Sequence, residues 1–317
     1  MGGALVAGST GFIGSHLVAR LRRELGPGAR IVGIGSGDVD LTDRDAAFAF
    51  FERLAAQHQI DHVFHLAALY KAGDWPVHHP ATQFFANMSM NVNAMEAWAR
   101  HLPGAKFTSV VSYCMYPAKD TPHPESELWG HEPEDYLFAY AFAKKGLLIG
   151  QRAYRQEYGL ESTSVVLPTI FGPGDSFAEN SHVVGALIGK FVRAVRDGAT
   201  EVEVWGDGEQ RREFLYVEDA VDGILAAARH SRADALNLGT GHAHSVRELV
   251  EMIHEASGFR GAVRYQPHDR FVGVKHRALD VTRARTELGW TAKTAVKAGI
   301  EATVRSYREE LARGGGE

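Results

Sequence analysis

The sequence predicts an α/β protein built on a doubly wound parallel sheet, with a smaller C-terminal lobe interleaved with that sheet. Three observations lead to this fold class. Short β-branched or apolar runs alternate with longer helical patterns through the first two-thirds of the chain, as in parallel βαβ units. A glycine-rich turn stands between the first apolar run and the first helical pattern. From about Pro168 onward the pattern becomes less regular, which indicates the second lobe.

The predicted strands are short and largely apolar, as expected for strands that are covered on both faces. They are Ala4–Ala7, Ile31–Ile34, His62–Leu66, Phe107–Ser112, Ser164–Leu167, Val202–Trp205 and Leu236–Leu238. The helical patterns between most of them are Phe12–Glu24, Arg44–Gln57, Phe84–Arg100, Tyr136–Tyr158 and Asp219–Ala228. Gly159 follows the fourth pattern and predicts its C-terminal end. The irregular part adds a turn at Gly172–Gly174 and helices at Val183–Arg196, Val246–Ala256 and Thr294–Glu310.

Bulk composition limits the classes of partner. The 317 residues suffice for two domains, and 34 basic and 39 acidic side chains are interspersed, giving a net charge of -5. This balance predicts no nucleic acid and no anionic membrane as a partner. A single cysteine allows no intramolecular disulfide, and the first apolar run is too short for a signal peptide or a spanning helix. We therefore expect a cytoplasmic protein that binds a small molecule.

A phosphate-binding loop is predicted directly after the first strand. It reads Gly8-Ser9-Thr10-Gly11-Phe12-Ile13-Gly14. Glycines at this spacing allow a tight turn and a close backbone approach to a pyrophosphate, whose charge lies at the N-terminus of the following helix. We therefore expect residues 1–168 to form a Rossmann-type dinucleotide-binding domain, to which segment 206–239 returns. Residues 169–205 and 240–317 would form the substrate-binding lobe.

The end of the second strand bears on the choice of cofactor, because an acidic side chain there would accept the ribose hydroxyls of NAD. The stretch reads Gly33-Ile34-Gly35-Ser36-Gly37 and contains no carboxylate. Repulsion of a 2′-phosphate is therefore reduced, and Ser36 could donate a hydrogen bond to it. We expect NADP(H) in preference to NAD(H). Asp38 or Asp40 could instead reach the adenosine, and we include Asp40 and Leu41 among the predicted cofactor contacts. The segment Asp40–Asp43 also fits a cap of the next helix.

A reactive pair is predicted on the fourth helix. Tyr140 and Lys144 are four residues apart and therefore share one helix face. A nearby ammonium favours the phenolate, so we expect a lowered pKa for Tyr140, suited to the proton transfer that accompanies hydride transfer at a carbinol or carbonyl. Ser112 ends a strand at the carboxyl edge of the sheet, where open α/β sheets bind ligands, and its hydroxyl would polarise a substrate carbonyl.

The loop, Ser112 and the Tyr140/Lys144 pair resemble, in order and spacing, the extended short-chain dehydrogenase/reductases of the NAD-dependent epimerase/dehydratase family. The resemblance runs through most of the chain and adds Leu66, Ala67 and Ala68, where the family's chain passes the cofactor. Tyr113 and Cys114 replace the Asp-Glu pair of the family's 4,6-dehydratases, and the stretch is similar to that of the GDP-L-fucose synthases, with their serine and cysteine. Further matching segments are Pro168–Phe177, Asn180–Val183, Val204–Gly208 and Arg211–Leu215.

The resemblance implies an NADPH-dependent 3,5-epimerase/4-reductase that acts on a nucleotide-linked 4-keto-6-deoxy sugar. Cys114 and His182 would move protons at C3 and C5, since both groups have ordinary pKa values within about two units of neutrality. Ser112 and Tyr140 would stabilise the enolate at O4. The implied cofactor contacts also include Tyr140, Lys144, Pro168 and His182. The implied substrate contacts are Asn180, Val183, Lys190, Trp205, Arg212 and Arg277.

Several positions depart from the fucose synthase pattern around the expected substrate cleft. Ile170 and Ser176 stand in place of asparagines, and Leu69–Lys71 and Val274–Arg277 also differ. A heptose or another deoxysugar therefore stays open as the substrate. The alternative function is a nucleotide-sugar C4-reductase, or a C4-epimerase that retains NAD, without epimerisation at C3 or C5. A nonenzymatic dinucleotide sensor is a third hypothesis, against which the complete catalytic set argues.

Other features have simpler interpretations. Arg212 would bind a diphosphate through its forked donors, or would form a surface ion pair with Glu209 or Glu213. Trp205 would pack over the substrate or fill the core. Two histidine pairs, His78-His79 and His242/His244, lack further ligands at a suitable spacing, so no metal site is expected. The resemblance also implies a homodimer formed through the helices predicted at 84–100 and 136–158.

Overall fold

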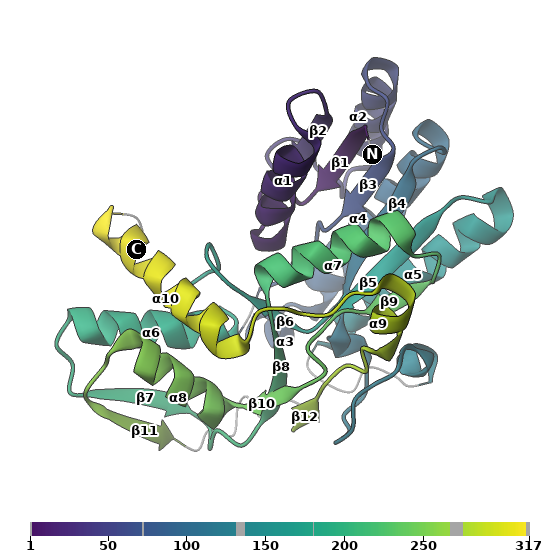
Figure 1. The fold of residues 1–317 in the computed structure, drawn as a ribbon. Helices are drawn as coiled ribbons and strands as arrows, with labels where there is room; N and C mark the ends of the chain where they lie inside the picture. The colour runs from purple at the N-terminus through teal and green to yellow at the C-terminus, as the bar shows by residue number, and fades with distance from the viewer. Residues whose placement is uncertain (1, 72, 131–136, 180, 267–274, 315–317) are drawn as a thin grey trace.

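The computed structural model describes residues 2–71, 73–130, 137–179, 181–266 and 275–314. Six strands form a parallel sheet in the order β2-β1-β3-β4-β5-β9, which occupies the upper right of Figure 1. Their bounds are β1 Gly3–Ala7, β2 Arg30–Ile34, β3 His62–His65, β4 Lys106–Ser112, β5 Ser162–Leu167 and β9 Ala235–Asn237. This sheet confirms the predicted doubly wound α/β fold.

The strand order reverses between β1 and β3. β1 pairs with β2 on one side and with β3 on the other, so successive connections leave β1 in opposite directions across the sheet. A crevice opens at such a point beyond the carboxyl ends of the strands, and open α/β sheets bind their ligands there. The segments that follow β1 and β3 therefore lie at the predicted cofactor site.

Helices cover both faces of this sheet. Along β1, Ala4 and Val6 belong to one buried core, whereas Leu5 and Ala7 belong to the other, as the alternation of a strand requires. The first core is closed by α1 (Phe12–Leu25) and α7 (Val217–His230). The second is closed by α2 (Arg44–Gln57), α4 (Pro80–His101) and α5 (Phe138–Tyr158).

A second group of elements lies beside the large sheet, at the lower left of Figure 1. Strand β8 (Arg211–Tyr216) pairs with β6 (Thr169–Phe171), β10 (Ala243–Ser245) and β12 (His276–Arg277). Strand β7 (Glu201–Trp205) pairs in parallel with β11 (Ala262–Gln266). Helices α6 (Val183–Arg196), α8 (Val246–Ser257) and α10 (Val296–Ala312) enclose a third core around Phe191, Ile253 and Ile300. The remaining elements are α3 (Trp75–His78), α9 (Thr282–Leu288) and two 3-10 helices, η1 (Tyr113–Met115) and η2 (Glu125–Trp129).

The ends of the predicted helices have the expected local causes. Helix α5 ends at Gly159, which has a left-handed φ of 69°. Helix α2 begins after Asp43, whose carboxylate accepts a hydrogen bond from the backbone N–H of Ala46. The cap predicted within Asp40–Asp43 is therefore confirmed. Tyr136, the predicted first residue of the fourth helix, lies outside the described residues, and the helix is described from Phe138.

The structure refines the predicted arrangement of the strands. The strand predicted at Val202–Trp205 lies outside the six-stranded sheet and pairs with β11. Within segment 206–239, α7 covers the large sheet and β9 joins it, whereas β8 belongs to the second sheet. The division into a dinucleotide-binding domain and a substrate-binding lobe stays a prediction. No helix in the described part of the chain is both long and apolar enough to span a lipid bilayer.

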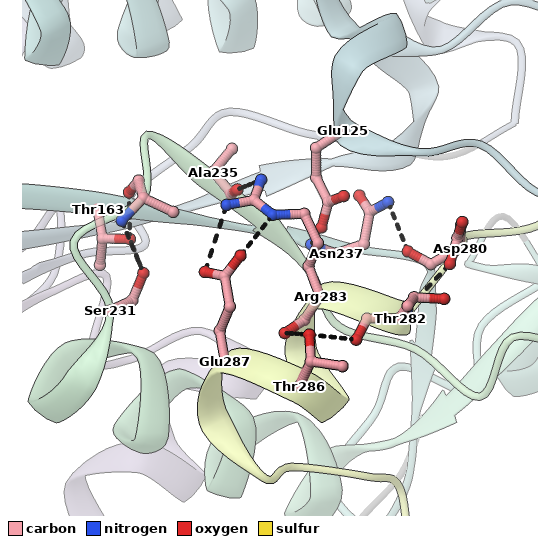
Figure 2. A network of polar contacts seen from close by, with 11 residues as sticks. Glu125, Thr163, Ser231, Ala235, Asn237, Asp280, Thr282, Arg283, Thr286 and Glu287 are labelled. Atoms are coloured by element: carbon pink, nitrogen blue, oxygen red, sulfur yellow. Dashed lines mark hydrogen bonds and ion pairs between the residues drawn. The ribbon is translucent and has the colours of Figure 1, made fainter.

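A polar network at the β9 edge joins the large sheet to the segment that carries β12. Figure 2 shows Asn237 between Glu125 and Asp280. The amide nitrogen of its side chain donates to the carbonyls of His123 (2.8 Å) and Asp280 (3.0 Å), and its side-chain oxygen accepts from the Tyr116 hydroxyl (2.7 Å). Its backbone N–H donates to Glu125 (2.9 Å). Asn237 thus fixes the chain a few residues beyond Arg277.

Candidate active site

A cavity of about 680 Å³ lies at the carboxyl edge of the large sheet. Its walls come from the loop after β1, the segment after β3, the end of β4, helix α5, the segment after β5, helix α6, and strands β8 and β12. These elements are far apart in the sequence, and the switch point between β1 and β3 brings them together. The cavity therefore joins the predicted cofactor loop, the predicted reactive groups and most of the predicted substrate contacts.

The loop after β1 has the shape that a dinucleotide diphosphate requires. Gly8 has φ 88°, and a Cβ there would lie 2.7 Å from the backbone nitrogen of Ala67. A Cβ on Gly14 would lie 2.0 Å from the carbonyl oxygen of Gly8, so only glycine lets α1 approach the loop this closely. Helix α1 begins after Gly11, which has no side chain to cap its amides, and Gly11, Phe12 and Ile13 line the cavity. The first amides of α1 can thus bind an anion, and the residues fit the predicted cofactor.

The other predicted cofactor contacts fall into two groups. Leu66, Ala68 and Pro168 line the cavity together with the loop. Ser9, Thr10, Ser36, Asp40, Leu41 and Ala67 are not among its lining residues. Ser36 is exposed beyond β2, and Asp40 accepts hydrogen bonds from the backbone and hydroxyl of Thr42. Leu41 is 5% exposed and packs in the core, and its cofactor contact stays a prediction.

The reactive residues from β4 and α5 meet at one side of the cavity. Ser112 ends β4, and its hydroxyl oxygen accepts a hydrogen bond from the backbone N–H of Cys114 at 3.3 Å. Lys144 is 3% exposed and donates to the carbonyl of Val110 at 2.9 Å. Its ammonium nitrogen lies 5.4 Å from the centre of the Tyr140 ring, which confirms that the two residues share one helix face. Ser112, Cys114, Tyr140 and Lys144 all line the cavity.

The expected lowering of the Tyr140 pKa is wrong for this arrangement. Burial raises the pKa of Tyr140 above its ordinary value, and the neighbouring Cys114 adds a smaller contribution in the same direction. Burial also lowers the pKa of Lys144 to about 8. Desolvation therefore outweighs the attraction between ammonium and phenolate on which the expectation rested. A phenol that stays protonated is nevertheless suited to donate a proton to a carbonyl that is being reduced.

His182 lies across the cavity at the start of α6. It is the residue that precedes the first turn of this helix, and its carbonyl accepts the backbone N–H of Ala186. Its side chain keeps accessible surface because it borders the cavity, while desolvation by the surrounding protein lowers its pKa. The Tyr70 ring stacks on the imidazole, with centroids 4.9 Å apart and planes inclined by 2°. Tyr70 also contacts the Tyr140 ring, at a centroid distance of 5.2 Å.

Three cationic side chains also line the cavity. Arg212 and Arg277 are paired residues on the adjacent parallel strands β8 and β12, and both line the cavity. Lys190 on α6 lies 5.1 Å from the ring of Trp205, which is 48% exposed, and both also line the cavity, as does Val183. Trp205 is therefore available to a ligand and is not a core residue. Asn180 lies outside the described residues.

The alternative ion pairs for Arg212 find no support. Glu209 pairs with Arg247, their side-chain oxygen and nitrogen lying 2.8 Å apart. Glu213 is fully buried and accepts hydrogen bonds from the backbone N–H groups of Gly241 (2.8 Å) and Leu279 (2.7 Å). The neighbouring carboxylates thus have other partners, and the guanidinium of Arg212 borders the cavity.

Sequence reasoning missed three polar residues of this cavity. Tyr70 stacks on His182, and Asp175 has a pKa raised to about 7 by burial. Tyr113 accepts or donates a hydrogen bond with the Thr169 hydroxyl at 2.9 Å, and Arg277 lies over its ring at 5.4 Å. The departure of Leu69–Lys71 from the fucose synthase pattern was a signal for Tyr70. The sequence assigned no role to the other two: Tyr113 stood out only as a replacement in the Asp-Glu pair of the dehydratases, and Asp175 only as part of a matching segment.

Comparison with known proteins gives a consistent result. The profile of the NAD dependent epimerase/dehydratase family matches residues 4–239. The chain is 31% identical to a probable GDP-L-fucose synthase of Oryza sativa subsp. japonica, over 98% of this chain and 93% of that protein. It is 32% identical to the GDP-L-fucose synthase of Escherichia coli (strain K12), over 97% of each. A GDP-L-fucose synthetase from Naegleria fowleri, solved bound to NADP, superposes with a TM-score of 0.86 at 26% identity, over 98% of this chain and 93% of that one.

Proposed function

The chain belongs to the NAD dependent epimerase/dehydratase family and is an NAD(P)-dependent nucleotide-sugar epimerase/reductase, and from this premise we propose a more specific reaction. The protein is an NADPH-dependent 3,5-epimerase/4-reductase of a nucleotide-linked 4-keto-6-deoxy sugar, similar in activity to the GDP-L-fucose synthases. One observation carries the proposal. Ser112, Cys114, Tyr140, Lys144 and His182 line the same cavity as the cationic residues Lys190, Arg212 and Arg277.

Different side chains of the cavity suit the two halves of such a substrate. Guanidinium groups bind paired phosphate oxygens through their forked donors, so Arg212 and Arg277 would hold the diphosphate. Trp205 offers an exposed ring, over which a base or sugar would pack. The sugar would then extend toward Tyr140 and His182, with its C4 carbonyl near the hydroxyls of Ser112 and Tyr140.

The side chains would divide the proton transfers between them. The C4 ketone acidifies the protons on C3 and C5, so one of Cys114 and His182 removes a proton and the other returns one to the opposite face of the same carbon. That carbon is thereby inverted, and no net proton is gained or lost. Ser112 and Tyr140 hold the enolate oxygen between the two transfers. In the reduction that follows, Tyr140 gives its proton to O4 as a hydride reaches C4.

The cofactor that supplies this hydride would be NADPH. Support comes from the absence of a carboxylate at Gly33–Gly37 and from the NADP bound by the Naegleria relative. The loop Gly8–Gly14 would hold its diphosphate, and Lys144 and Pro168 would lie along its nicotinamide half. We expect lower KM for NADPH than for NADH, measured by steady-state kinetics with one ketosugar.

Deuterium exchange tests the proposed reaction. The protein would be incubated in deuterated water with NADPH and freshly generated GDP-4-keto-6-deoxymannose, while NADPH absorbance and product mass are followed. Because C4 receives its hydrogen from the cofactor, carbon-bound deuterium reports only exchange at C3 and C5. Oxidation of NADPH with deuterium at both carbons supports the proposal. Oxidation without deuterium would leave the alternative C4-reductase, and no reaction would direct the assay to other nucleotide ketosugars.

The variant Cys114→Ser separates epimerisation from reduction. We expect its deuterium exchange to fall by about 10²-fold or more, since a positioned acid/base group contributes about that factor. Its reduction of an already epimerised ketone should stay within about threefold of wild type, because Ser112, Tyr140 and Lys144 remain. An equal loss of both activities would instead indicate that Cys114 has only a packing role at this 3% exposed position.

A further inference from the structure

The stack of Tyr70 on His182 is the strongest feature of the cavity that the proposed reaction does not use. The two rings are parallel within 2° with their centroids 4.9 Å apart, the geometry of an offset stack in which the phenol ring covers part of one face of the imidazole. The Tyr70 ring also meets Tyr140, tilted by 58° at 5.2 Å. Tyr70 therefore stands between the group proposed to protonate O4 and the group proposed to act at the adjacent carbons.

The backbone beside Tyr70 is held firmly. The side chain of Asn87 on α4, which is 2% exposed, accepts a hydrogen bond from the N–H of Leu69 and donates one to its carbonyl, both at 3.0 Å. The same amide nitrogen donates to the carbonyl of Gln83 at 2.7 Å. A buried amide thus fixes the residue before Tyr70 to a long helix, so the ring starts from a defined backbone position.

The opposite partner is also fixed through its backbone. His182 precedes the first turn of α6, where its carbonyl accepts the N–H of Ala186 at 2.9 Å. Its imidazole borders the open cavity, so only rotation about the side-chain bonds would be free. The parallel contact with Tyr70 restricts that rotation, because turning the imidazole plane would break the stack.

We propose that Tyr70 is the positioning residue of His182, setting the plane of the imidazole so that its ring nitrogen faces the sugar carbon beside C4. The inference rests on the proposed acid/base role of His182. Proton transfer to carbon depends steeply on alignment, and a displacement of about 1 Å can lower a rate by about 10²-fold. The aromatic ring of Tyr70, and not its hydroxyl, is the part that the stack requires.

Two variants isolate the ring. Tyr70→Leu removes it but keeps an apolar side chain, whereas Tyr70→Phe retains it without the hydroxyl. We expect Tyr70→Leu to lower deuterium exchange at C3 or C5 by about 10- to 100-fold, with reduction of an already epimerised ketone within about threefold of wild type. Tyr70→Phe should restore exchange to within about threefold. The matched control is Tyr158→Leu, a tyrosine that is 58% exposed at the end of α5, and it should leave both rates unchanged.

A spectroscopic measurement tests the stack without relying on activity. Protons that lie over the face of an aromatic ring resonate upfield, so the His182 carbon-bound imidazole protons should be upfield shifted in protein with ¹³C-labelled histidine. The resonance is assigned by its loss in His182→Asn. Tyr70→Leu should move it downfield toward ordinary histidine values, while Tyr70→Phe and Tyr158→Leu should not.

The outcomes separate this inference from the proposed function. Exchange that depends on His182 but is unaffected by Tyr70→Leu would overturn the positioning role and leave the reaction standing. A wild type without exchange would remove the proposed epimerisation. The resonance of His182 would then still report whether the stack exists, and an unchanged resonance in Tyr70→Leu would overturn the stack itself.

Discussion

Lys144 shows how burial changes the chemistry of a residue that the sequence identifies. Its ammonium is enclosed, donates to the carbonyl of Val110 and lies 5.4 Å from the Tyr140 ring centre. Because burial lowers its pKa to about 8, the side chain is charged below that pH and neutral above it. The positive charge that would stabilise negative charge at O4 and Tyr140 is therefore lost as the pH rises through about 8.

We accordingly expect kcat for ketone reduction to fall as the pH rises from about 7 to 9, measured by NADPH oxidation at saturating substrate. Lys144→Met should be about 10²-fold slower below pH 7 and should lack this alkaline decrease. A decrease of the same size in both proteins would assign the titration to another group. Circular dichroism at pH 9 serves as the control for folding.

The candidate site was predictable where its residues are linked by local spacing. Tyr140 and Lys144 are one helical turn apart, and Ser112 ends a recognisable strand, so the sequence alone identifies all three. Tyr70 and Asp175 have no such relation to their neighbours along the chain, and their place in the cavity depends on folding. The error on the Tyr140 pKa has the same origin, because helix spacing indicates the nearby charge but not the desolvation that outweighs it.

Strand β9 is tied to its surroundings through the side chain of Asn237. Asn237 is fully buried, and each of its side-chain polar atoms is hydrogen bonded, to Tyr116, His123 and Asp280. Removing the amide would leave a buried hydroxyl and two buried carbonyls without these partners. Unsatisfied buried polar groups cost about 1 to 3 kcal/mol each, partly relieved by relaxation.

We expect Asn237→Ala to lower the free energy of unfolding by about 3 kcal/mol, measured by urea denaturation. It should also raise KM for the nucleotide sugar more than it lowers kcat, because the chain near Arg277 loses its anchor. Thr286→Ala, an exposed position of the same network in Figure 2, should change stability by less than about 0.5 kcal/mol. Equal effects of the two substitutions would contradict the central role of Asn237.

Length decided only part of what the sequence could predict, since the three-residue β9 was predicted whereas the six-residue β8 and the five-residue β11 were not. The strands of the large sheet and the long helices have clear periodicity, and their observed bounds lie close to the predicted ones. Strands β6, β10 and β12 have only two or three residues, too few to show any period. Each of them pairs with β8. Strand β12 nevertheless brings Arg277 beside Arg212 on β8, a pairing that no local pattern indicates.

At the scale of the whole molecule, the outer surfaces of α4 and α5 are unusually apolar for helices facing water. Phe85 is 67% exposed and Phe142 is 51% exposed, and Phe142 lies 5.9 Å from the ring of Phe84 on the neighbouring helix. Val92 on α4 and Ile149 on α5 extend the exposed apolar surface. Large apolar side chains gathered on the exposed sides of two packed helices are typical of an interaction surface, as the homodimer expected through these two helices would require.

The homodimer stays a prediction, and a charge placed among these exposed apolar residues tests it. We expect Phe85→Glu and Ile149→Glu, singly or combined, to shift the molar mass measured by light scattering from dimer to monomer, because a buried unpaired carboxylate opposes association. The control Val195→Glu changes a residue that is 39% exposed on α6, outside α4 and α5, and should remain dimeric. Within one subunit these positions are exposed, so each substitution by itself should change the free energy of unfolding of the monomer by less than about 0.5 kcal/mol. A monomeric wild type, or a dimer that persists in both variants, would show that Phe85 and Ile149 do not form a dimer interface.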